Sequence, residues 1–224
     1  MNAALCAEAA ATGSLSLPTL DGSVDIYDAA SEEVLVMSDA IQVKAQKPTR
    51  ESAGRSPKKE KKTKRVSTGL LLLESRDGSF RYLSAGLDGE VGLPEVARAH
   101  LKREWGEHPG ALPVVAITDG ARSIRATLEK VFGSSVRVIL DWYHLAKRTY
   151  QSLSMVAHDK AERERLERRA LSLLWGGRVS EALSYLGGIS ARREEALASL
   201  VLYLRNHASE IVDYERRAKG GKSI

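Results

Sequence analysis

Short apolar runs separated by polar turns divide residues 33–140 into predicted strands and helices. The runs with the length or the alternation of a strand lie at 33–46, 67–75, 79–87, 113–118 and 136–140. Apolar residues recur at helical intervals at 93–105 and 121–132, with Pro94 in the first turn of one helix and Gly133 after the other. The predicted order is three strands, a helix, a strand, a helix and a fifth strand.

This order of elements predicts a mixed sheet. The Asp77-Gly78 pair between the second and third strands is a hairpin signal, and we expect the first three strands to be antiparallel. The later alternation of helices with strands is typical of parallel pairing. In a ribonuclease-H-like arrangement the first and fourth strands are parallel neighbours. We therefore expect an α/β fold with a ribonuclease-H-like mixed five-stranded sheet that brings Asp39 and Asp119 to one edge.

From Leu145 onward the pattern is helical throughout. It predicts a long helix that Gly176-Gly177 closes, a short helix at 179–190, and a long amphipathic helix at 191–218. Three parts are expected: a flexible lead-in, a catalytic-type core with an internal disordered linker, and an all-helical region. Their predicted bounds are 1–32, 33–150 with the linker at 47–65, and 151–224.

The positive charge of the chain is concentrated in the predicted linker. The formal net charge is +5, but residues 47–65 hold nine Lys or Arg against two Glu, so the rest of the chain is slightly acidic. Such basic, apolar-poor segments are disordered and commonly contact phosphates. A solubilising linker is the alternative, and composition does not decide between the two. The candidate DNA contacts here are Lys58, Lys59, Lys61, Lys62, Lys64 and Arg65.

Composition excludes several classes of protein. The single cysteine, Cys6, rules out an internal disulfide framework and fits a reducing cytosol. Zinc-type Cys/His spacing and a HExxH motif are absent from the sequence. No apolar run approaches the length of a membrane span, and the N-terminus lacks the early basic residues of a secretory signal. We expect a cytoplasmic protein without a membrane partner or a small-molecule cofactor.

Two aspartates, one within a predicted strand and one directly after another strand, are the sharpest candidates for catalytic or metal-binding residues. Asp39 lies within the first strand, and Asp119 follows the apolar run that ends at Thr118. Converging carboxylates bind Mg²⁺ through oxygen, and two such ions can activate and stabilise the oxygens of a phosphodiester. An aspartate at this position is also a common helix cap or turn residue. A nucleotide-binding turn at 118–123 ranks last, because it holds a single glycine.

The stretch DWYHLAKR, which follows the fifth strand, contains a second group of candidates. Asp141 and His144 share a helical face, so His144 can meet a phosphate or orient a metal-bound water, or Asp141 can simply cap the helix. Trp142 and Tyr143, in the same stretch, can stack on a base, although core packing is the commoner role. Lys147 and Arg148 are candidate phosphate contacts on the same helix.

The amino-acid sequences of these motifs resemble the catalytic region of bacterial DDE-type insertion-sequence transposases, in the branch related to Mutator-like elements. The resemblance rests on SDAIQVKAQ around Asp39, RYLSAGL, AITDGARSIRATLEKVFG around Asp119, and ILDWYHLAK around Asp141. A weaker similarity extends through YLRNHASEIVDYERRAKGGKSI, so that most of 33–224 is covered.

The resemblance implies a DNA transposase of a mobile element, which cuts and rejoins DNA by metal-dependent strand cleavage and transfer. Asp39 and Asp119 match its first two acidic positions and would bind Mg²⁺ or Mn²⁺, with two ions in the intact site. Asp141 and His144 match a supporting Asp-x-x-His element. The resemblance also implies a ribonuclease-H-like core with an all-helical insertion region after the fifth strand. The expected partner is DNA, at the ends of the mobile element and at its target site, in the bacterial nucleoid. Self-association of the chain stays open.

The family's third acidic residue, a glutamate, follows a Gly-Ser-Gly turn that comes after a stretch like RRAKGGKSI. The sequence stops at Ile224, so the expectation is a truncated copy that lacks this residue. Whether the chain is an enzyme is therefore open. The alternative is a catalytically inactive, DNA-binding remnant of a transposase.

Overall fold

The computed structural model of the chain describes residues 4, 19–21, 23–44, 65–84, 92–106 and 111–224. For residues 39–44, 65–69 and 84 it describes the backbone alone. The predicted linker up to residue 64 and most of the predicted lead-in lie outside the described residues.

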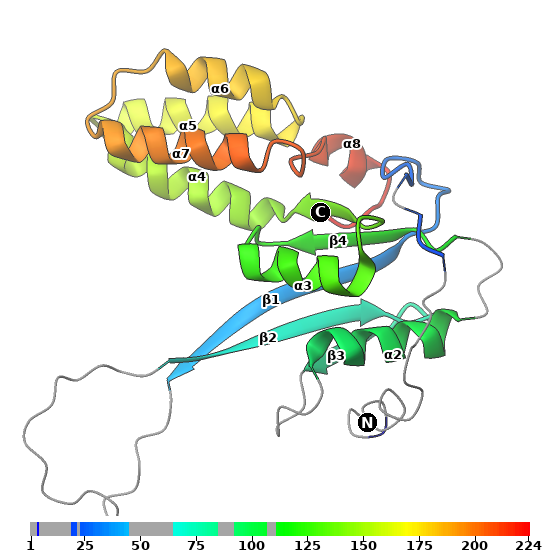
Figure 1. The fold of residues 1–224 in the computed structure, drawn as a ribbon. Helices are drawn as coiled ribbons and strands as arrows, with labels where there is room; N and C mark the ends of the chain where they lie inside the picture. Colours follow the sequence, from blue (N-terminus) through cyan, green and yellow to red (C-terminus); the bar gives the residue numbers. More distant parts are fainter. Residues whose placement is uncertain (1–3, 5–18, 22, 45–64, 85–91, 107–110) are drawn as a thin grey trace, which may run out of the picture.

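A five-stranded mixed sheet forms the centre of the molecule (Figure 1). Its strands are β1 (Val34–Lys44), β2 (Arg65–Glu74), β3 (Phe80–Ser84), β4 (Val114–Thr118) and β5 (Arg137–Leu140). The order is β3-β2-β1-β4-β5; β2 is antiparallel to both of its neighbours, and β4 is parallel to β1 and β5. The predicted mixed sheet of an α/β protein is confirmed. One bound is corrected, because Arg65, assigned to the linker, is the first residue of β2.

Seven helices within the described residues pack against this sheet or on one another. They are α2 (Leu93–Trp105), α3 (Arg122–Phe132), α4 (Trp142–Val156), α5 (Lys160–Trp175), α6 (Val179–Gly187), α7 (Glu194–Asn206) and α8 (Tyr214–Lys219). None of these helices has both the length and the apolar character needed to cross a membrane. The predicted boundary between residues 150 and 151 falls inside α4.

The prediction of one uninterrupted helix from Leu145 to the Gly176-Gly177 pair is wrong. The helix breaks after Val156, and a new one begins at Lys160 with Asp159 as its N-cap. The Asp159 carboxylate accepts from the backbone N–H of Glu162 at 2.8 Å. This D-x-x-E pattern is a helix-start signal that the high helix propensity around it concealed.

The long helix predicted at 191–218 is also wrong, because it consists of α7 and α8 with a connection between them. The chain leaves the helix after Asn206 so that the backbone carbonyl of Glu210 can accept from the N–H of Leu140 in β5, at 2.9 Å. Ile211 and Val212 are buried in the connection. Tertiary contacts with the sheet therefore override local helix propensity here.

Each face of the sheet has its own hydrophobic core. Val114 and Ala116 of β4 face a core completed by α2 and α3, while Val115 and Ile117 face a second core completed by α4–α8. All five residues of β4 are buried, as expected for a parallel strand covered on both faces. Figure 1 shows α3 lying against the sheet and α4–α7 forming a separate helical layer.

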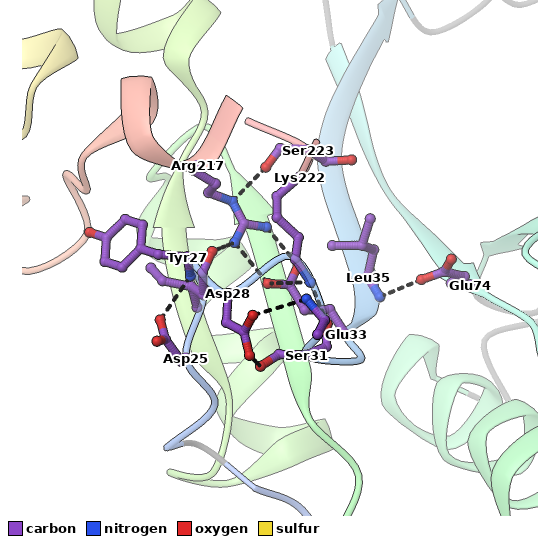
Figure 2. A network of polar contacts seen from close by, with 12 residues as sticks. Asp25, Tyr27, Asp28, Ser31, Glu33, Leu35, Glu74, Arg217, Lys222 and Ser223 are labelled. Atoms are coloured by element: carbon purple, nitrogen blue, oxygen red, sulfur yellow. Dashed lines mark hydrogen bonds and ion pairs between the residues drawn. The ribbon is translucent and has the colours of Figure 1, made fainter. Parts of the chain in front are cut away.

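A buried ion pair fastens the last helix to the chain just before β1 (Figure 2). The guanidinium of Arg217 is fully buried and donates two hydrogen bonds to the carboxylate of Glu33, at 2.8 and 2.9 Å. It also donates to the backbone carbonyls of Ile26 and Ser223, both at 2.6 Å. Lys222 lies 3.7 Å from Glu33 on the same side. Arg217 therefore ties the C-terminal residues to the segment that precedes β1.

Candidate functional site

Asp119 and Asp141 directly follow β4 and β5, and Asp39 lies within β1 just past the end of its pairing with β4. Ser38 of β1 lies opposite Thr118 of β4, so the backbones of Asp39 and Asp119 are the next positions along two parallel strands. Asp141 follows β5, and its N–H donates to the carbonyl of Thr118 at 2.7 Å. The carboxyl ends of adjacent parallel strands are where such sheets bind ligands. The structure describes the backbone of Asp39 but not its carboxylate.

Asp119 holds the turn between β4 and α3 rather than capping the helix. Its Oδ1 accepts from the N–H of Ala121 at 2.8 Å, and Ala121 is the N-cap of α3 without a side-chain cap. The turn requires Gly120, whose φ of +81° lies in the left-handed region. The carboxylate remains partly exposed. Asp119 therefore combines a structural hydrogen bond with access to solvent.

Asp141 is the N-cap of α4, which confirms the structural alternative for this residue. Its Oδ1 accepts from the N–H of His144 at 3.1 Å. The imidazole Nδ1 of His144 lies 3.5 Å from the same oxygen but makes no hydrogen bond within the described residues. Both side chains are about a third exposed, at 30% and 39%. The cap thereby fixes the backbone of His144 and leaves its imidazole beside the Asp141 carboxylate.

A cavity of about 240 Å³ brings several predicted site residues together. Its lining residues are Asp119, His144, Lys147, Arg148, Gln151 and Tyr203. Arg148 lies with its guanidinium carbon 5.9 Å from the centre of the Tyr203 ring and donates to Ser199 at 3.1 Å. Lys147 and Arg148 are exposed, as phosphate contacts must be. The cavity thus joins one carboxylate, an imidazole and two cations.

The pKa of Tyr203, on α7, is raised by its surroundings at this edge of the sheet. Burial raises the pKa of its phenol to about 12, and the charges of Asp119, Glu210 and Asp141 act in the same direction, against the guanidinium of Arg148. The phenol is therefore protonated at neutral pH. Carboxylates from three separate elements lie within electrostatic reach of one side chain.

Sequence reasoning did not assign Glu210 and His207 to this region. The buried carboxylate of Glu210 forms an ion pair with Arg125 of α3 and lies within hydrogen-bond distance of Nδ1 of His207, at 2.6 Å. The imidazole of His207 packs so closely on Gly120 that a Cβ there would lie 2.7 Å from Cε1. The i, i+3 spacing of His207 and Glu210 was visible in the sequence, but their approach to the Asp119 turn depends on the break after α7.

The aromatic pair after β5 divides into one buried and one exposed residue. Trp142 packs against Trp175 and Tyr214, with ring centroids 4.8 and 5.2 Å away, so core packing is confirmed for it. Tyr143 is 64% exposed.

The basic residues predicted in the linker have mixed outcomes. Lys58, Lys59, Lys61, Lys62 and Lys64 lie outside the described residues, whereas the backbone of Arg65 pairs with Lys44 in the sheet. Their role as DNA contacts stays a prediction.

The described residues contain no group of three or more His, Cys, Asp or Glu side chains placed to hold a metal ion. Asp119 is suited to contribute one oxygen, since only its Oδ1 is hydrogen-bonded within the described part of the chain. Comparisons with protein-family models, curated proteins and solved structures gave no match.

Proposed function

We propose that the chain is the catalytic region of a DDE-type DNA transposase with a ribonuclease-H-like fold. The observation that carries the proposal is the parallel pairing of β1 with β4, whose register makes Asp39 and Asp119 adjacent at the carboxyl end of the sheet. The strand order and the position of Asp141 after β5 add support. Self-association and residence in the bacterial nucleoid belong to the same proposal.

In this proposal Asp39 and Asp119 hold Mg²⁺ or Mn²⁺ through carboxylate oxygens, which are the ligands these ions prefer. Two such ions, when bound, stabilise the attacking and leaving oxygens of a phosphodiester. Asp141 positions His144 beside the cavity through the cap of α4. Lys147 and Arg148 offer exposed cations to the DNA phosphates.

A catalytically inactive DNA-binding protein of the same origin is the second candidate. The exposed pair Lys147 and Arg148 favours it, because cations on one helix turn can bind phosphates without chemistry. This candidate predicts salt-sensitive DNA binding that is weakened when residues 47–64, the basic segment before β2, are deleted. Equal binding by the deletion variant would exclude that prediction.

The decisive experiment compares DNA cleavage by the wild-type chain, Asp39→Asn, Asp119→Asn and the control Asp159→Asn, in Mg²⁺, Mn²⁺ or EDTA. The amide oxygen of Asn at 119 can still accept from Ala121, so the turn is retained. We expect metal-dependent cleavage that the first two variants abolish and the control keeps. Cleavage that survives both changes, or no cleavage by the wild type in either metal, would reject the catalytic proposal.

A further inference from the structure

The outer face of α4 carries two exposed tyrosines on either side of a lysine. Tyr143 is 64% exposed and Tyr150 is 47% exposed, whereas the opposite side of the helix is buried in the core. Tyr143, Lys147 and Tyr150 follow one another at helical spacing, so they share a face. The two rings are separated along the helix by about 10 Å, roughly three stacked base steps.

The lysine of this face is held against an aromatic ring rather than against a carboxylate. The ammonium of Lys147 lies 5.4 Å from the centre of the Tyr143 ring. Within the described part of the chain it forms no ion pair, whereas Lys160, on the next helix, pairs with Glu164. A cation beside exposed rings is the combination that binds single-stranded nucleic acid, since rings stack on bases while cations meet phosphates.

The same face leads directly into the candidate site. The ring of Tyr143 contacts the ring of His144 edge-on, with centroids 5.4 Å apart. His144 and Lys147 both line the cavity that contains Asp119. A strand whose phosphate occupies this cavity would therefore have its neighbouring bases within reach of α4.

We infer that Tyr143, Lys147 and Tyr150 form a stacking surface for unpaired nucleotides of the DNA strand that enters the Asp119 cavity. This inference rests on the function proposed above, and it adds that the substrate is single-stranded next to the reacting phosphate. Duplex DNA cannot use the surface in this way, because its base faces already stack on one another. The rings contribute affinity, and Lys147 contributes a salt-dependent phosphate contact.

The test measures binding of the whole chain to a fluorescein-labelled oligo(dT) of about 20 nucleotides and to a duplex of equal length. Fluorescence anisotropy in EDTA prevents cleavage, and the salt concentration is varied from about 50 to 200 mM. The variants are Tyr143→Ala, Tyr143→Phe and Lys147→Ala. The matched controls are Tyr82→Ala, a 67% exposed tyrosine on β3 at the far edge of the sheet, and Lys160→Ala.

We expect Tyr143→Ala to weaken oligo(dT) binding roughly 5- to 100-fold without changing the slope of log affinity against log salt. Tyr143→Phe restores binding, because the ring alone is needed. Lys147→Ala lowers the salt slope by about one phosphate contact. Neither control should move the affinity, and duplex binding should be insensitive to the tyrosine.

Three results overturn the inference: no oligo(dT) binding by the wild-type chain, an equal loss with Tyr82→Ala, or an equal loss on the duplex. These results are separable from the fate of the proposed function. Cleavage that depends on Asp119 but not on Tyr143 would reject the stacking surface alone. Tyrosine-dependent binding without any metal-dependent cleavage would reject the catalytic proposal and keep the surface.

Discussion

Breaking the buried ion pair between Arg217 and Glu33 should destabilise the whole fold. In Glu33→Ala the guanidinium stays fully buried but loses two of its four hydrogen bonds and its only negatively charged partner among the described residues. Removing one member of such a pair costs about 3–5 kcal/mol, because an uncompensated charge remains in a low-dielectric site. For a chain of this size, that loss lowers the melting temperature by roughly 10 °C.

The assay is urea unfolding followed by far-ultraviolet circular dichroism, with wild type and variants at one pH and salt concentration. Lys219→Ala is the matched control, because Lys219 and Glu215 form a close ion pair on the same helix but both side chains are exposed. Solvent screens that pair, and its removal should leave the urea midpoint almost unchanged. If Glu33→Ala and Lys219→Ala unfold at the same urea concentration, the reasoning from burial is wrong.

A double variant separates the cost of the unpaired charge from the loss of packing. Arg217→Met leaves the carboxylate of Glu33 beside Lys222, 3.7 Å away, so its loss of stability should be smaller than that of Glu33→Ala. The combination Arg217→Met with Glu33→Leu removes both charges. It should recover much of the stability lost in Glu33→Ala, because well-packed apolar residues can replace a buried pair.

Three further groups of substitutions test other parts of the fold, each by urea unfolding. Gly78 has φ +75° and open space around it, so Gly78→Ala should cost about 1–2 kcal/mol of stability through backbone strain alone. Gly120→Ala should cost more, because its Cβ would also lie 2.7 Å from the imidazole of His207. Equal losses of stability in the two variants would contradict this packing. Asp141→Ala and Asp159→Ala remove N-caps and should each cost about 0.5–2 kcal/mol, whereas Asn at either position should restore stability. Burial lowers the pKa of His100 from 6.5, so on acidification the unfolded chain takes up a proton before the folded chain does. Stability from this residue is complete above about pH 6.5 and is lost as the pH falls toward the folded-state pKa, and His100→Gln should reduce that loss.

The strands could be predicted because their signals are local. The run 114–117 is apolar at every position, which is typical of a parallel strand covered on both faces, and its parallel pairing with β1 was expected from a ribonuclease-H-like arrangement of the elements. Asp39 and Asp119 were placed at one edge by the same argument. The strands of the sheet could therefore be predicted from their hydrophobic runs, and the hairpin between β2 and β3 from the turn signal at Gly78.

The helical part was predicted less well because its signals are long-range. Helix propensity continues through the breaks after Val156 and Asn206, and only the cap at Asp159 and the pairing of Glu210 with β5 end the helices there. Arg217, near the C-terminus, is buried, and no local pattern distinguishes it from an exposed arginine that binds DNA.

The way in which the buried and half-buried carboxylates are paired separates structural groups from candidate functional groups. Glu210 pairs with Arg125 and contacts the imidazole of His207, and Glu33 pairs with Arg217 and Lys222, so these buried carboxylates have their partners within the fold. Asp119 shares a cavity with Lys147 and Arg148, yet within the described residues it forms an ion pair with neither. The two cations lie over tyrosine rings instead. In the proposed function, this arrangement leaves the carboxylate of Asp119 available to a cation and the two basic groups available to phosphate.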